Sequence, residues 1–148
     1  MQLREIMTEN ICCASPTDSL AELASEMKRH NVGIMPVCDG DRLVGVITDR
    51  DIALQCVSAG SNPKDCKASD FMSSQLVFGT PDMDITHAAQ LMGHEQVHRL
   101  PVVDHGRLVG MVSIGDVALH CEDDKIVAGL LREISMPVRS QKMELAAA

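Results

Sequence analysis

Apolar residues recur along the chain at the spacing of amphipathic helices. In residues 16–28 and 81–92 they lie three or four positions apart, which places them on one helical face. Proline and aspartate turn residues precede both segments, as is typical of helix starts. Each segment is therefore predicted to form an amphipathic helix. The apolar positions are Leu20, Leu23, Ala24 and Met27 in the first segment, and Ile85, Ala88, Ala89 and Met92 in the second.

Two short apolar runs follow the first helix. They cover residues 32–37 and 43–48, and the turn residues 38–42 between them predict a hairpin of two strands. A second helix is predicted from about Asp49 to Gly60. With a strand ahead of the first helix, the order is β-α-β-β-α, and a strand-helix-strand crossover makes the first two strands parallel.

The same series of elements occurs twice. A shift of 65 residues aligns residues 4–54 with 69–119 without a gap, and about 15 of 51 positions are identical. We therefore predict repeat 1 at residues 1–60, a linker at 61–68 and repeat 2 at 69–122. A further apolar stripe predicts a C-terminal helix at 123–135, followed by a tail at 136–148.

The predicted fold is α+β, with two pseudo-symmetric β-α-β-β-α repeats. A unit of about 50 residues buries too little surface to be stable alone. The repeats are therefore expected to pack through their sheets and to leave pseudo-two-fold clefts between them. The apolar second helices, 52–57 and 117–119, also predict a homodimer, since a lone module would leave them partly exposed.

Composition restricts the partners. The formal net charge of -8 repels phosphate backbones and anionic lipids, so neither nucleic acid nor membrane is an expected partner. Residues 1–10 lack the apolar core of a signal peptide, and the chain has no apolar run of about 18 residues that could span a bilayer. Six cysteines occur without a C-x-x-C pair. This pattern predicts free thiols in a reducing cytoplasm.

One motif, Gly-x-x-Thr/Ser-x-x-Asp, occurs at the same place in both repeats, at residues 45–51 and 110–116. The hydroxyl of Thr48 or Ser113 lies where a strand ends and a helix begins. Asp51 or Asp116, one turn later, offers two acceptor oxygens to the vicinal diol of a ribose. The alternative is purely structural, with the hydroxyls as helix caps and the aspartates as first-turn partners of the helix dipole.

The duplicated motif and its flanking strands resemble tandem CBS domains, named after cystathionine β-synthase and called a Bateman module when paired. The resemblance covers residues 1–120 and includes the small stand-alone bacterial type. It implies a regulatory module that binds an adenosine-containing ligand in its clefts: AMP, ADP, ATP, S-adenosylmethionine or NAD. It also implies a homodimer and a regulated partner protein whose identity the sequence does not give.

The resemblance assigns ligand-binding roles to both repeats. Apolar strand residues would hold the adenine, and Arg50 and Arg99 would contact phosphate. Gly115 stands where Arg50 does, and Ile34 where Arg99 does, so the two clefts are expected to differ in their preference for charged ligands. The candidate residues are Ile34, Pro36, Thr48, Arg50 and Asp51 in repeat 1, and Arg99, Leu100, Pro101, Ser113 and Asp116 in repeat 2.

Two apparent catalytic motifs do not fit the repeat. Residues 94–98 read H-E-x-x-H, but the alignment starts a strand at Val97, so His94 and His98 should not share a helical face. Residues 110–115 resemble a nucleophile elbow, but the serine is one position too late. No catalytic residues are therefore predicted, and the chain is not expected to be an enzyme.

An alternative function remains open: a stress-response structural protein with empty nucleotide clefts. Zinc would stabilise it, with His94, His98 and His120 as weak candidate ligands beside Glu95 and Cys121. A redox-active disulfide is the other possibility. Cys12 or Cys13 on the first strand could face Cys38 if those strands are parallel neighbours.

Overall fold

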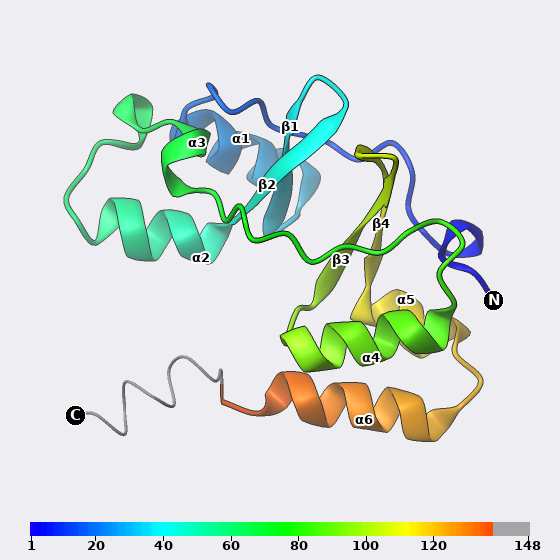
Figure 1. Cartoon of the computed structure of the whole chain (residues 1–148). Coiled ribbons are helices and arrows are strands. Elements are labelled where there is room, and N and C mark those ends of the chain that lie inside the picture. Colours follow the sequence, from blue (N-terminus) through cyan, green and yellow to red (C-terminus); the bar gives the residue numbers. More distant parts are fainter. Residues whose placement is uncertain (138–148) are drawn as a thin grey trace. The chain divides into compact units, whose positions relative to one another are not determined.

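The computed structural model describes residues 1–137, and its mixture of helices and strands confirms the predicted α+β class (Figure 1). Beyond Met136 and Pro137, the predicted tail lies outside the described residues. The elements are η1 (Leu3–Glu5), α1 (Leu20–His30), β1 (Ile34–Asp39), β2 (Arg42–Thr48), α2 (Asp49–Asp51), η2 (Ile52–Val57, a π-helix), η3 (Pro63–Asp65), α3 (Ala68–Phe71), α4 (Ile85–Glu95), β3 (Arg99–Asp104), β4 (Arg107–Ser113), α5 (Ile114–His120) and α6 (Asp124–Ser135).

The chain divides into two compact units whose bounds differ from those of the sequence repeats. Unit 1 comprises Met1–Glu9, Val77–Val102 and Val109–Ala148, of which the structure describes residues up to 137. Unit 2 comprises Asn10–Leu76 and Val103–Leu108. Each unit thus combines the helices of one repeat with the leading segment of the other.

Paired backbone bonds hold each leading segment. In unit 1, Thr8 and Met111 exchange two bonds of 2.9 and 3.0 Å, and in unit 2, Ser73 and Val46 do the same at 2.9 and 3.0 Å. Thr8 and Ser73 are equivalent positions of the two repeats, as are Val46 and Met111. The duplication therefore extends to the exchanged segments.

Unit 2 is built around α1 and the β1–β2 hairpin. Ser19 caps α1 and forms a capping box with Glu22, and the helix ends at Asn31 in the left-handed conformation. The strands pair antiparallel from Ile34 with Thr48 onward. The buried face of α1 joins the inward residues of the hairpin in one core, which includes Leu20, Leu23, Met27, Met35, Val37 and Ile47.

Unit 1 repeats this plan and adds α6. Asp84 caps α4, which ends at left-handed Gln96, the equivalent of Asn31. α6 lies beside α4, and its Leu130 is buried in the unit 1 core (Figure 1). That core also contains Leu3, Ile85, Met92, Leu100, Val102, Val112 and Val117.

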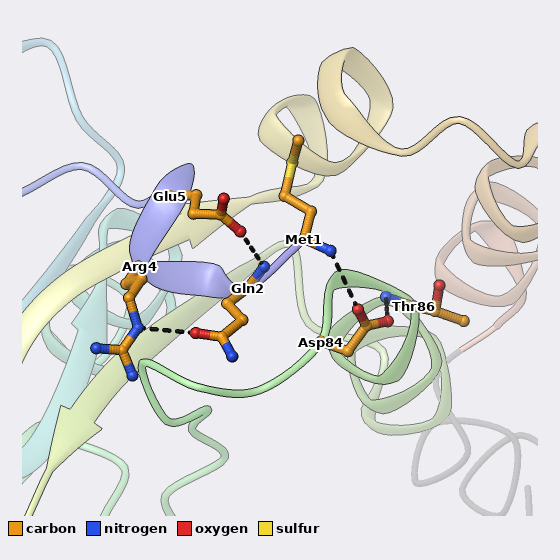
Figure 2. A network of polar contacts seen from close by, with 6 residues as sticks. All are labelled: Met1, Gln2, Arg4, Glu5, Asp84 and Thr86. Atoms are coloured by element: carbon orange, nitrogen blue, oxygen red, sulfur yellow. Dashed lines mark hydrogen bonds and ion pairs between the residues drawn. The ribbon is translucent and has the colours of Figure 1, made fainter.

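Polar contacts fix the leading segment to α4 (Figure 2). The Asp84 carboxylate accepts from the Thr86 amide at 2.9 Å and lies 3.4 Å from the Met1 ammonium. The Gln2 amide donates to the Glu5 carboxylate, and Arg4 Nε donates to Gln2 Oε1 at 2.9 Å. The Thr86 amide first, and then the Met1 ammonium, hold the pKa of Asp84 below its ordinary value.

The predicted first strand of each repeat is a single bridge. Ala14 pairs with Val37 and Gly79 with Val102, both in the parallel sense expected of the crossover. The remaining four strands are ordered β1-β2-β4-β3. The β2–β4 pairing is made inside unit 2, at Arg42 and Arg107, because the tip of the second hairpin belongs to that unit.

Candidate functional site

The turn between β2 and α2 in unit 2 is a reciprocal capping box. The Asp51 amide donates to Thr48 Oγ1 at 3.0 Å, and the Thr48 amide donates to Asp51 Oδ2 at 2.9 Å. Both residues are half-buried. Within the described residues, the Asp51 carboxylate accepts its hydrogen bond through Oδ2. Its Oδ1 is therefore left for a further donor.

The turn between β4 and α5 in unit 1 repeats this geometry. The Asp116 amide donates to Ser113 Oγ at 3.1 Å, and the Ser113 amide donates to Asp116 Oδ2 at 2.7 Å. The Ser113 hydroxyl also donates to Asp116 Oδ2 at 2.9 Å. The structural alternative raised by the sequence is thus present in both copies, since both motifs cap a helix.

The other candidate residues of unit 2 lie on both sides of its turn. Ile34 is half-buried and pairs with Thr48 across the hairpin. Arg50 is exposed inside the turn, whereas Pro36 is buried. Contact of Pro36 with a ligand would need its side chain to be uncovered.

Unit 1 shows the same division. Arg99 is exposed at the start of β3, whereas Leu100 and Pro101 are buried and Leu100 belongs to the core. The backbone bond from Ile114 N to His98 O, 3.0 Å, places the start of α5 beside the start of β3. Each unit therefore brings a hydroxyl, a carboxylate and an exposed cation to the strand ends from which its second helix starts.

Both repeats match a family of known proteins. A family model described as CBS domain matches residues 3–57 and 68–123, that is, both repeats. The chain belongs to the CBS domain family. The match indicates a paired regulatory module and no catalytic family.

Relatives of similar length carry the same CBS pair. The CBS domain-containing protein YhcV of Bacillus subtilis is 40% identical over 133 residues, 90% of this chain and 94% of that protein. Hypoxic response protein 1 of Mycobacterium tuberculosis is 34% identical over 125 residues, 84% of this chain and 87% of that protein.

Two solved CBS structures contain bound groups. The crystal structure of hypoxic response protein I, described with two coordinated zinc ions, has a TM-score of 0.76 and 33% identity, covering 81% of this chain and 98% of that chain. The CBS domain pair of protein MJ0100, in complex with 5-methylthioadenosine and S-adenosyl-L-methionine, has a TM-score of 0.70 and 27% identity, covering 80% of this chain and 94% of that chain.

A groove on unit 1 lies apart from the motif. It runs between α4 and α6, has a volume of about 390 Å³ and is lined by residues that include His94, Lys125 and Glu133. None of the ten candidate ligand residues lines it, so it does not correspond to the motif-based site. Among residues 1–137, no helix is long and apolar enough to cross a membrane.

The six cysteines, all within the described residues, are free thiols. Burial, reinforced by the neighbouring Cys13 thiol, raises the pKa of Cys38 to about 12. A cysteine pair without any sequence signal joins unit 2's second helix to the segment after it, with Cys56 Sγ 3.6 Å from Cys66 Sγ. Cys66 also has a raised pKa, first from burial and then from its bond with Cys56.

Within the described residues, His94, His98 and His120 do not belong to a group of three or more metal-ligating side chains. His94 pairs with Glu95 at 3.2 Å, and His120 Nδ1 lies 2.9 Å from the Asp116 carbonyl oxygen. Within the described chain, the group of three or more metal-ligating side chains is Cys12, Glu26 and His30. Glu26 and His30 carry a visible signal, the i,i+4 spacing on a predicted helix. No sequence pattern places Cys12 beside them.

Proposed function

We propose that this CBS pair is a non-catalytic regulatory module that binds an adenosine-containing ligand at one or both capping-box turns. The observation that carries the proposal is the duplicated turn: Asp51 and Asp116 each bond their box through Oδ2. An acceptor oxygen thus remains on each for the ribose hydroxyls. The adenosine derivatives bound by the MJ0100 domain pair support this ligand class.

The ligand acts by differential affinity. A ligand changes a conformational equilibrium only as far as it binds one arrangement more tightly than the other. We propose that it biases the association of the module with a homodimer partner or a regulated protein. AMP, ADP, ATP, NAD and S-adenosylmethionine all present the ribose that the carboxylates would bind.

Titration calorimetry with AMP, ATP, NAD and S-adenosylmethionine tests the site. Asp51→Asn and Asp116→Asn keep one oxygen that can accept the hydrogen bond of the capping box. They remove the negative charge and the second acceptor oxygen that would bind the ribose. We expect at least one of them to weaken binding about tenfold or more, because hydrogen bonds to charged groups contribute about 1.5 to 3 kcal/mol. Thermal melts verify folding.

The matched controls are Asp39→Asn and Asp104→Asn, an exposed pair of equivalent aspartates outside the turns. They should bind as wild type does. Equal affinity of all four variants, or no binding by the wild type, would overturn the proposal. Loss in one variant alone would show that one turn carries the site.

Dimerisation has its own support. Leu54 and Val57 on η2 are 54% and 61% exposed, and Leu119 on α5 is 82% exposed. Large apolar side chains at this exposure are typical of contact surfaces. We propose that the second helices pair in a homodimer. Sedimentation at micromolar concentration should then show a species of twice the 16.0 kDa chain mass.

The Cys13 and Cys38 contact favours a second candidate, a stress-responsive protein with empty nucleotide sites. Cys13 is exposed and donates to the Ile11 carbonyl oxygen at 3.5 Å, and its thiol is near enough to the buried Cys38 thiol to help raise the pKa of Cys38. A peroxide would take two electrons and two protons from the thiols: its O–O bond breaks as the S–S bond forms, and the products are two waters, or one water and one alcohol from an alkyl hydroperoxide. A disulfide found by mass spectrometry after mild peroxide, with no nucleotide binding, would favour this candidate.

A further inference from the structure

Three side chains with different donor atoms converge on the surface of unit 2. Cys12 lies ahead of the bridge at Ala14, while Glu26 and His30 lie one turn apart on α1. Their donor atoms all lie within 4.8 Å of one another. Cys12 Sγ is 3.8 Å from Glu26 Oε2, and His30 Nε2 is 3.2 Å from the same oxygen. The group therefore includes one sulfur, one oxygen and one nitrogen.

These spacings match the edges of a zinc coordination tetrahedron. Zinc bonds of about 2.3 Å to sulfur and about 2.0 to 2.2 Å to nitrogen and oxygen place neighbouring ligand atoms roughly 3.3 to 3.6 Å apart. The two measured distances differ from this range by a few tenths of an ångström. The third edge, between Cys12 Sγ and His30 Nε2, is within 4.8 Å, so the two side chains would move closer together around a bound ion.

The charges of the group also suit a divalent cation. A Cys12 thiolate and the Glu26 carboxylate contribute two negative charges, and His30 contributes a neutral nitrogen. Without metal, the Cys12 thiol donates to the Glu26 carboxylate. A metal ion would replace that proton. His30 is exposed, which leaves room for water in the fourth position.

One nearby charge opposes the metal. Arg29 Nη1 lies 3.5 Å from Glu26 Oε1, the carboxylate oxygen that faces away from the thiol contact. The positive charge of Arg29 would repel a bound cation and lower its affinity. A substitution that removes this charge should therefore raise the affinity. Other histidine pairs of the chain differ from this group. His94 with Glu95 and His105 with Asp104 have a carboxylate partner, but no thiol joins them in a group of three.

We propose that Cys12, Glu26 and His30 form a zinc site on unit 2, with water as the fourth ligand. The site uses none of the histidines suggested by the sequence and none of the residues of the capping-box turns. The solved structure of hypoxic response protein I, to which this chain is similar, holds two coordinated zinc ions.

The test uses the full chain, reduced and stripped of metal. Cobalt(II) reports the thiolate through its charge-transfer absorbance, and zinc is then titrated against a chromophoric chelator. We expect one metal ion per chain. Cys12→Ser should abolish the charge-transfer band, and Glu26→Gln and His30→Gln should each weaken zinc binding at least about tenfold, since even outer-shell changes cost that much.

Matched controls separate this site from the other thiols and histidines. Cys13→Ser, at the adjacent cysteine, and His94→Gln should keep both the band and the affinity, and Arg29→Gln should tighten binding. The proposal is overturned if Cys12→Ser keeps the band, if Cys56→Ser loses it instead, or if wild type binds no metal. Nucleotide titrations of the same variants should be unchanged, so failure here is distinct from failure of the adenosine proposal.

Discussion

The turn at Thr48 to Asp51 and the turn at Ser113 to Asp116 differ in the two residues that each encloses. In unit 2 these are Asp49 and the exposed Arg50, and the Arg50 amide donates to Asp49 Oδ1 at 2.8 Å. In unit 1 they are Ile114 and Gly115. The capping boxes are alike, so duplication kept the hydrogen-bond frame and changed the charges inside it.

The helices after the turns differ as well. α5 is α-helical from Ile114 to His120, whereas the second helix of unit 2 becomes π-helical at Ile52–Val57 after one short α-helical turn. π-Helical segments occur frequently at functional sites. Unit 2 therefore differs from unit 1 in its charged turn and its π-helix, and it also contains the contact between Cys56 and Cys66.

In each unit, the strand residue that faces the exchanged leading segment is a glycine with no room for a side chain. A Cβ at Gly45 would lie 2.5 Å from Met72 Sδ, and one at Gly110 would lie 2.6 Å from Met7 Sδ. We expect Gly45→Ala and Gly110→Ala each to lower the free energy of unfolding by about 1 to 3 kcal/mol in urea titrations.

The matched control is Gly129→Ala on α6, where a Cβ meets nothing within 4 Å. It should leave stability unchanged or raise it. Adding Met72→Ala to Gly45→Ala should cost less than the sum of the single changes, because the clash is gone. Full additivity would show that the segment does not pack against this strand.

Cys38 and Val103 are equivalent positions of the two repeats, and at alkaline pH only the cysteine should affect stability. The unfolded Cys38 thiol loses its proton near the ordinary value of 9.0, but the folded thiol keeps it to about 12. Its contribution to stability is therefore complete below pH 9 and is lost as the pH rises towards 12. At pH 10 the loss should be about 1 kcal/mol.

Cys38→Val, which copies the residue of the other repeat, should remove this alkaline loss. Urea titrations at pH 7, 9 and 10 of wild type and variant measure it. Equal slopes for the two proteins would show that the thiol does not titrate from a buried environment.

The helices, hairpins and duplication could be predicted because each depends on local periodicity or on self-similarity. The partner of a leading segment could not. The 65-residue repeat is compatible with two pairings of Thr8: with Val46 of its own repeat, or with Met111 of the other repeat, as observed. Packing decides between these, and neither spacing nor composition encodes it.

The candidate site shows the same limit. The capping boxes of Thr48 and Ser113 follow from residues three apart, so the motif predicted them. The burial of Pro36 and Leu100 depends on what covers the strands, which the apolar pattern of a strand does not specify. Cys12 lies far from Glu26 in sequence, and only the path of the chain after Asn10 brings the thiol to α1.

The smallest expected effect concerns Arg50 and Gly115. If Arg50 contacts phosphate, Arg50→Gly should weaken ATP binding roughly 3- to 10-fold, the range of an exposed charge contact. Adenosine, which lacks phosphate, should be almost unaffected. Gly115→Arg should raise ATP affinity at the other turn, where a Cβ meets Ser113 Oγ at an ordinary 3.4 Å.

Lys64→Gly is the control, because it removes one positive charge from the exposed linker and leaves both turns intact. If it weakens ATP binding as much as Arg50→Gly does, the effect comes from the net charge of the chain and the two turns are equivalent. If Arg50→Gly alone acts, and on ATP more than on adenosine, the enclosed charge distinguishes the two turns. Calorimetry at two salt concentrations adds a second check, since an exposed phosphate contact weakens as ionic strength rises.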